Sequence, residues 1–352
     1  MKNSVLKFRH EVIDPEPNGS HQDVCLIADI NGNGRNDIVI GAFKGEDNLV
    51  WYESPTWKRH VISTASLEAG GDVMDITGNG RLDIVAGQLT GKELYWFENP
   101  EDPTQQWTRR IIDDTILDYH DQAFGDVNGD GKMELVALSK RDDLGVYYDI
   151  PDDPRVEPWP ESCKHVIYEG LKLEGLAILD IDGDGINEVI AGTNIFKPNE
   201  KPQQPWKRLP IVEGWQATRA AVADLNGDGI LDIVLCEAET HPARLAWFEG
   251  PDWKMHSLRD DIFHGHSLAI ADFNGDGLPD IFVGEMGLGR NPDPRLIIYL
   301  NQGDGEFEEI IIQRGIPTHE AKVGDLTGDG RPDIVGKPFQ PESHIDVWFN
   351  EI

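Results

Sequence analysis

A nine-residue loop motif occurs seven times in this sequence of 352 residues. A clear copy is residues 272–280, Asp-Phe-Asn-Gly-Asp-Gly-Leu-Pro-Asp, with oxygen-bearing side chains at positions 1, 3, 5 and 9 and glycine at positions 4 and 6. Glycine lets the backbone curl so that these oxygens point inward, and a short loop can then enclose a hard cation such as Ca²⁺. The motif therefore predicts up to seven structural calcium sites.

The predicted calcium ligands are the side chains at positions 1, 3, 5 and 9 of each copy. Thr77 and Thr327 at position 3, and Asn33 and Asn79 at position 5, keep an oxygen but carry no charge, so the first two loops are expected to bind most weakly. The full set is Asp29, Asn31, Asn33, Asp37, Asp75, Thr77, Asn79, Asp83, Asp126, Asn128, Asp130, Glu134, Asp180, Asp182, Asp184, Glu188, Asp224, Asn226, Asp228, Asp232, Asp272, Asn274, Asp276, Asp280, Asp325, Thr327, Asp329 and Asp333.

The spacing of the motif indicates a repeat protein rather than a set of EF-hands. An EF-hand needs an acidic residue at loop position 12 and a helix on each side. Successive copies start 44 to 54 residues apart, a period typical of repeat architectures. Position 12 is occupied by residues that cannot ligate a cation through the side chain: Ile40, Ala86, Ala137, Ala191, Leu235, Val283 and Gly336.

The sequence pattern predicts four short strands in each repeat. Apolar runs such as 267–271 precede the loop, runs such as 37–41 follow it, and an aromatic run such as 94–97 comes third. A Trp-x-x-His pattern, as in 57–62, marks the fourth strand, and its histidines (His10, His60, His165 and His256) are expected to pack rather than to react. Repeat 4 departs from the pattern over 193–205, so its third strand is expected to be short or missing.

Seven repeats of four strands predict an all-β, seven-bladed β-propeller that forms one domain over residues 1–352. The last repeat lacks its fourth strand, whereas the chain begins with an unpaired strand over 5–13. Pairing of this strand with the last blade would close the ring and protect the edge strands.

The loop motif followed by Ile-Val resembles the FG-GAP/VCBS repeat found in integrin α-chain propellers and in many bacterial enzymes. This resemblance covers essentially the whole chain and implies the propeller fold, whereas a propeller supports many activities. The chain is more weakly similar to the propellers of aldos-2-ulose dehydratases and rhamnogalacturonan lyases, and no catalytic residue is carried over from them.

The composition argues against several partners and locations. The net charge of −33 argues against nucleic acid and anionic membrane surfaces as partners, and neither is expected. The three cysteines are far apart and indicate no disulfide framework. The start, Met1 to Lys7, lacks the apolar core of a secretion signal, which predicts a cytoplasmic protein.

Histidines gather at the predicted mouth, which is the end of the ring opposite the calcium loops. Counting back six residues from each loop gives the start of the inner strand, where His120, His266 and His319 fall in one ring position. Imidazoles beside carboxylates can act as general bases or hold a transition metal or Mg²⁺. A polar, water-filled lining is the alternative interpretation.

The mouth residues fall into two predicted groups. The catalytic candidates are His120, His266 and His319 as base or metal ligands, Arg219 and Lys322 as stabilisers of an enolate or carboxylate, and Asp121 or Glu320 as residues that orient a histidine. The candidates for substrate binding are His21, Asp23, Glu174, His264, Glu237, Glu285, Gln88 and Trp215.

These residues favour a lyase or dehydratase that acts on a sugar or uronate by β-elimination. That chemistry needs a base for the proton next to a carboxylate or carbonyl, and positive charge to stabilise the enolate. Two alternatives stay open. One is a non-catalytic propeller that binds a glycan or protein, and the other is a glycoside hydrolase with a carboxylate pair such as Glu237 and Glu285. The expected partner is a small carbohydrate or oligosaccharide.

Overall fold

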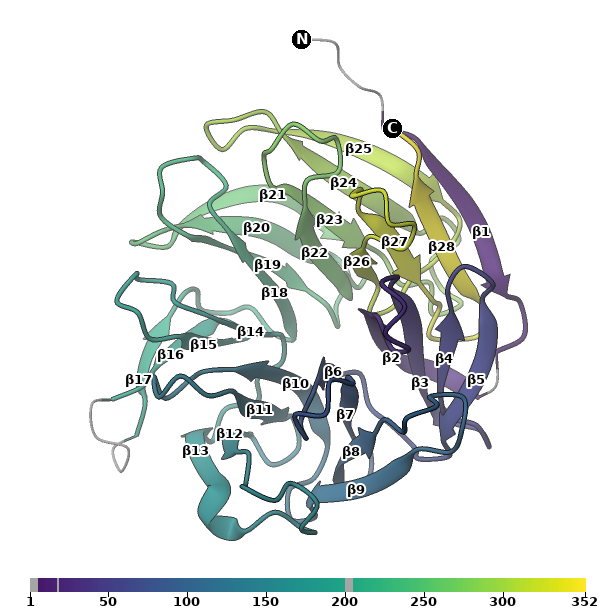
Figure 1. Cartoon of the computed structure of the whole chain (residues 1–352). Coiled ribbons are helices and arrows are strands. Elements are labelled where there is room, and N and C mark those ends of the chain that lie inside the picture. Colours follow the sequence, from purple (N-terminus) through teal and green to yellow (C-terminus); the bar gives the residue numbers. More distant parts are fainter. Residues whose placement is uncertain (1–5, 18, 200–204) are drawn as a thin grey trace.

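The computed structural model describes residues 6–17, 19–199 and 205–352, which form seven four-stranded antiparallel sheets arranged around a central axis (Figure 1). The predicted seven-bladed β-propeller is confirmed. Residue 5 of the expected first strand and residues 200–204 of the irregular fourth repeat lie outside the described residues.

Each blade begins at the central axis with an inner strand, and the second strand starts at position 9 of the calcium-loop motif. Blades 1 to 7 are numbered from β2 onward. The inner strands are β2 (Ser20–Ala28), β6 (Asp72–Met74), β10 (Tyr119–Gly125), β14 (Leu176–Leu179), β18 (Thr218–Ala223), β22 (Ser267–Ala271) and β26 (Lys322–Gly324). The second strands are β3 (Asp37–Lys44), β7 (Asp83–Gly87), β11 (Glu134–Ser139), β15 (Glu188–Ala191), β19 (Asp232–Glu237), β23 (Asp280–Gly284) and β27 (Asp333–Gly336).

The third and outer strands complete the blades, and the short third strand expected in repeat 4 is present as β16. The third strands are β4 (Leu49–Glu53), β8 (Leu94–Glu98), β12 (Leu144–Asp149), β16 (Asn194–Lys197), β20 (Ala243–Glu249), β24 (Arg295–Asn301) and β28 (Ile345–Asn350). The outer strands are β5 (Lys58–Ser63), β9 (Thr108–Asp113), β13 (Lys164–Glu169), β17 (Lys207–Pro210), β21 (Lys254–Ile262), β25 (Phe307–Arg314) and β1 (Phe8–Asp14). A single 3₁₀ turn, η1 (Glu161–Cys163), precedes β13 among the described residues.

The N-terminal strand closes the ring, as the sequence predicts. Strand β1 pairs antiparallel with β28, with Phe8 opposite Asn350 and Val12 opposite Asp346. In Figure 1 the purple β1 lies along the outside of the yellow β28. The last blade therefore contains both terminal strands, with β28 covered by β1, and β1 forms the outer edge of the blade.

The hydrophobic core lies between neighbouring blades. One buried cluster joins Val39 and Trp51 of blade 1 to Ile84 and Phe97 of blade 2. The aromatic third-strand residues supply the largest buried side chains, as their repeated pattern predicts. The four outer-strand histidines stack on these rings, which confirms their packing role; the pairs are His10–Trp348, His60–Trp51, His165–Tyr147 and His256–Trp247.

The strand order places the calcium-loop motifs and the mouth at opposite ends of the inner strands. Strand β22 starts at Ser267, directly after His266, and ends at Ala271, directly before the loop that opens with Asp272. A strand of this kind runs from one face of the ring to the other. One face therefore carries the repeated loops, and the other carries the residues that precede each inner strand.

Within the described parts of the chain, no helix has the length and apolar character needed to cross a membrane.

Candidate functional site

A cavity of about 370 Å³ opens at the mouth, where several inner strands begin. This volume lies within the range of small-molecule sites. Four polar residues that the register places at this end line the cavity, namely Asp23, His120, His266 and His319. The other polar or aromatic residues of the lining are Glu68, Lys140, Glu239, His264, Arg290, Phe339 and Gln340.

Arg219 is the centre of a buried network beside this cavity. Its side chain is 8% exposed, and its Nη1 lies 3.1 Å from Oε2 of Glu174. Its Nε donates to Oε1 of Glu320 at 2.6 Å, and its Nη2 lies 2.8 Å from Nδ1 of His266. Every nitrogen of the guanidinium therefore has a protein partner, so Arg219 organises the site.

His266 is held between two carboxylates and Arg219. Nδ1 of His266 lies 2.8 Å from Nη2 of Arg219 and 3.2 Å from Oε1 of Glu320, while Nε2 lies 2.9 Å from Oε1 of Glu239. Burial and Arg219 lower the pKa of His266, but the hydrogen bonds to Glu239 and Glu320 raise it overall. The same contact keeps the pKa of Glu239 well below its usual range.

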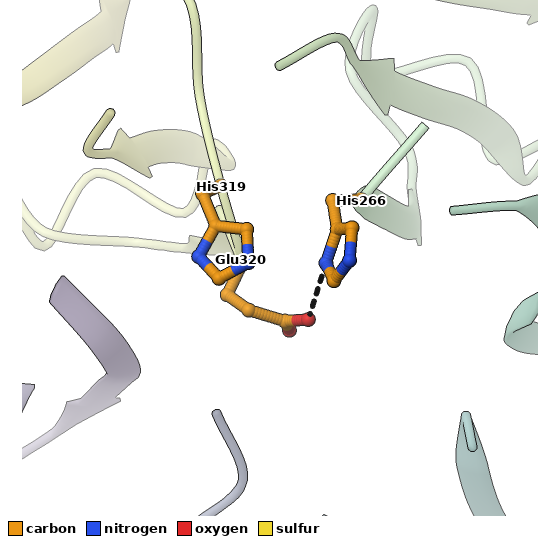
Figure 2. Close-up of side chains that lie close together, drawn as sticks. All are labelled: His266, His319 and Glu320. Carbon is orange, nitrogen blue, oxygen red and sulfur yellow. Dashed lines mark hydrogen bonds and ion pairs between the residues drawn. The ribbon is translucent and has the colours of Figure 1, made fainter. Parts of the chain in front are cut away.

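His319 is held as a neutral imidazole. Its ring lies beside that of His266, with centroids 4.4 Å apart, and Glu320 reaches past it toward His266 (Figure 2). Burial, His266 and Lys337 together hold the pKa of His319 well below its usual value. Nδ1 lies 3.3 Å from the backbone carbonyl of Gln22, which can only accept, so Nδ1 carries the proton and Nε2 keeps its lone pair.

Lys337 fixes the backbone beneath His319. This lysine is fully buried, and its Nζ donates to the carbonyl oxygen of His319 at 2.7 Å. Burial lowers its pKa, although Asp23 and Glu320 oppose that effect. Lys337 is therefore a positioning residue for His319.

His120 is oriented by an acidic neighbour, as the sequence hypothesis proposes. Its Nδ1 lies 2.8 Å from Oδ2 of Asp121, and its Nε2 lies 3.3 Å from Oε2 of Glu174. Burial alone would raise the pKa of Asp121, but His120 and Arg219 lower it to about 2. Lys140 lies 3.4 Å from the same Glu174 oxygen and keeps a raised pKa, so it remains a cation at the cavity wall.

Two carboxyl groups of the cavity have raised pKa values. Burial raises the pKa of Asp23 to about 7, and burial together with Asp23 and Asp118 raises that of Glu68 to about 9. Oε2 of Glu68 is buried without a hydrogen-bond partner among the described residues. Glu68 therefore offers the cavity a neutral acid that can donate a proton.

A second cavity of about 580 Å³ adjoins the first and shares Lys140 and Glu239 with it. It is lined by Glu174 and Trp215, two of the predicted substrate-binding residues. Trp215 is 7% exposed and packs against Phe248, so little of its ring is free to stack on a sugar.

The predicted residues Gln88, Glu237 and Glu285 lie at equivalent ends of their blades, where each braces a hairpin loop. Glu237 forms a two-point ion pair with Arg244, and Glu285 forms one with Arg295. Gln88 donates to Tyr95 and Glu93. None of the three lines the 370 Å³ cavity.

The remaining predicted residues lie at the edge of the site. His264 lines the cavity, and its buried Nδ1 has no hydrogen-bond partner among the described residues. The ring of His21 packs edge-on against Phe339. Lys322 is half exposed, and its Nζ lies 3.8 Å from Oε2 of Glu320.

Sequence reasoning missed Glu68 and Glu239 as mouth residues. Blade 2 has a short inner strand, β6, that begins only at Asp72, so the six-residue count selects Ala69 instead of Glu68. The glycines at 70 and 71 were the available signal that strand alternation would fail there. Glu239 follows the end of β19 by two residues, where the sequence does not define the loop direction.

The repeated loop has one backbone arrangement in all seven copies, and in the blade 4 copy the ligand atoms of Asp180, Asp182 and Glu188 lie within 4.8 Å of one another. In every copy the position-1 carboxylate accepts the backbone N–H of the position-6 glycine, as in Asp272 with Gly277 at 2.8 Å. The same bond recurs in the other copies at 2.7 to 2.9 Å. In blade 4, however, the ammonium of Lys197 contacts the loop carboxylates.

Ligand atoms for a metal also approach one another at the mouth. His266, His319 and Glu320 form one group within 4.8 Å, and Glu174, Glu239 and His266 form another. Arg219 contacts Glu320, Glu174 and Nδ1 of His266, so a permanent cation already lies against both groups. A metal ion there would have to overcome repulsion by this guanidinium.

The fold and the repeated loops define a class, the Asp-rich repeat propellers. A family model described as FG-GAP-like repeat matches residues 29–86, 75–137, 180–235, 224–283 and 272–336. These matches span more than half of the chain, which therefore belongs to the FG-GAP-like repeat family. No curated protein sequence matches the chain.

Solved structures with the same fold include a matrix protein and two lyases. The V. cholerae biofilm matrix protein Bap1 matches with a TM-score of 0.57 at 12% identity, over 98% of this chain and 92% of Bap1. Rhamnogalacturonan lyase YesW matches with a TM-score of 0.54 at 11% identity, over 97% of this chain and 75% of YesW. The exotype rhamnogalacturonan lyase YesX gives 0.53 at 13% identity, over 93% and 72%. At these identities the matches show a shared fold.

Proposed function

We propose that this propeller is a carbohydrate lyase that cleaves an acidic sugar by β-elimination in the mouth cavity. The observation that carries the proposal is the pairing, in one cavity, of a neutral imidazole, His319, with a protonated carboxyl group, Glu68. Elimination needs such a base and such an acid at the same pH. The fold shared with two rhamnogalacturonan lyases supports this class of reaction.

In the proposed reaction, Nε2 of His319 removes the proton from the carbon next to the substrate carboxylate. Lys140 and Arg290, the cations of the lining, hold that carboxylate and stabilise the negative charge that develops on it. The electron pair then forms a C=C bond as the C–O bond breaks, and Glu68 gives its proton to the departing oxygen. Exchange with water restores both groups.

A glycoside hydrolase is the second candidate, and one observation favours it. Glu68 and Glu239 line the same cavity, but their pKa values are shifted in opposite directions, raised to about 9 for Glu68 and well lowered for Glu239. Glycosidases use such a pair, in which one carboxyl group stays protonated as the acid and the other stays ionised. The pair Glu237 and Glu285 is less suitable because each is bound to an arginine.

The test compares His319→Ala with His256→Ala on uronate-containing oligosaccharides and on their neutral counterparts. His256 is the matched control because it is an outer-strand histidine stacked on Trp247. We expect the wild type and His256→Ala to release products with the ultraviolet absorbance of a new C=C bond. Loss of the base in His319→Ala should slow this release about 10²–10⁴-fold.

The other outcomes separate the alternatives. New reducing ends without ultraviolet absorbance would replace the lyase with the hydrolase. Binding of an oligosaccharide without any cleavage would indicate a non-catalytic propeller and would refute both enzyme proposals.

A further inference from the structure

The blade 4 loop differs from the other six in the residue that faces its position-9 carboxylate. This residue lies on the third strand, directly opposite position 9. In blade 4, Val189 of β15 pairs with Phe196 of β16, so the next pair along the two antiparallel strands is Glu188 with Lys197. In the other six blades, the third-strand residue opposite position 9, found in the same way, is not positively charged. Their residues are Glu53, Glu98, Asp149, Glu249, Leu300 and Phe349.

The Lys197 ammonium lies where a bound cation would lie. It forms an ion pair with Asp182 at position 3, and it lies 2.7 Å from Oδ2 of Asp184 at position 5. It also lies 3.4 Å from Oε1 of Glu188 at position 9. One ammonium thus contacts three of the four side chains that would hold Ca²⁺, whose oxygen ligands must approach to about 2.3–2.6 Å.

The next residue, Pro198, gives a second and independent difference. In five other blades the residue at this point donates its backbone N–H to the position-9 aspartate at 2.8 to 2.9 Å; these donors are Ser54, Asn99, Gly250, Asn301 and Asn350. Proline has no N–H. Oε1 of Glu188, which is buried, has no hydrogen-bond donor among the described residues and faces Lys197 instead.

The ammonium of Lys197 is a compact point charge that lies against these carboxylates and neutralises part of their charge.

We infer that Lys197 is the built-in cation of the blade 4 loop and takes the place of Ca²⁺ there, so that the chain binds calcium in at most six loops. Ligand charge alone leads to the opposite expectation, because this loop has four carboxylates, more than any other copy. The inference does not depend on the proposed lyase activity.

The test is the calcium content of chelator-stripped, reloaded protein, measured by elemental analysis beside protein concentration. We expect Lys197→Met to bind one calcium ion more than the wild type, because an uncharged side chain frees the carboxylates. Lys207→Met is the matched control, because Lys207 of β17 lies opposite Lys197 of β16 but is exposed. This variant should bind the same number of calcium ions as the wild type.

The location of the added ion is checked with Lys197→Met combined with Asp182→Asn, which should return the count to the wild-type value. Lys197→Gln serves as a second neutral variant if the methionine variant does not fold. Seven calcium ions in the wild type would overturn the inference, and so would an unchanged count in folded Lys197→Met and Lys197→Gln.

Discussion

The two faces of the propeller lie at opposite ends of the same inner strands, yet they are built in different ways. On the loop face, each blade repeats one short motif, and the bond from the position-6 glycine N–H to the position-1 carboxylate recurs in all seven copies. At the mouth, equivalent positions carry different side chains, such as Asp23, Glu174 and His266, and mouth side chains contact one another across blades, as Arg219 does with Glu320 and His120 with Glu174. The repeat therefore specifies the scaffold, and departures from it specify the site.

The largest expected effect is on the loop face. If six loops bind Ca²⁺, each ion held at 100 times its dissociation constant adds about 2.7 kcal/mol to the free energy of unfolding. Removing calcium with a chelator should lower the melting temperature by more than about 10 °C. An unchanged melting temperature by calorimetry would show that the backbone hydrogen bonds of the loops are sufficient without a metal.

The second expected effect is at the mouth. Arg219→Met leaves the buried carboxylates of Glu174 and Glu320 without their main partner and should cost about 3–5 kcal/mol in the free energy of unfolding. Arg244→Met is the control, because Arg244 pairs with Glu237 but its side chain is 44% exposed, so its loss should cost about 1 kcal/mol or less. Urea unfolding in saturating calcium measures both. Equal losses would contradict an organising role for Arg219.

The smallest expected effect is a pH dependence that arises from Glu68. Its pKa is about 9 in the folded chain, against about 4.5 when unfolded. Below pH 4.5 the carboxyl group is protonated in both states, but above it the unfolded chain loses the proton first, so folding stability is lost as the pH rises toward 9. The slope is at most about 1.4 kcal/mol per pH unit.

Glu68→Gln removes this titration. Its free energy of unfolding, measured by urea at pH 6 and pH 9, should therefore rise relative to wild type by about 1–3 kcal/mol between the two. A constant difference between the two proteins would show that Glu68 is already ionised in the folded state.

The sequence was sufficient to predict the scaffold because every feature that specifies it is local and repeated. The loop motif, the alternation of apolar residues and the aromatic third strands predicted seven blades, and the unpaired strand around Phe8 predicted the closure with β28. The mouth histidines could be placed on one face because a strand that starts directly after His266 and ends directly before Asp272 fixes both ends at once.

The tertiary structure decided which side chains meet and which are already occupied. It added Glu68 and Glu239 to the site, because their positions depend on an irregular strand start and on a loop. It also showed that Glu237 and Glu285 form ion pairs with arginines on a neighbouring strand. Arg219 pairs with Glu320, which is distant in the sequence. It also placed Lys197 among the blade 4 carboxylates, where the motif by itself indicated a strong calcium site. The physical reason is that side-chain distance, burial and charge pairing depend on neighbouring strands and blades, whereas the repeat records only the local backbone.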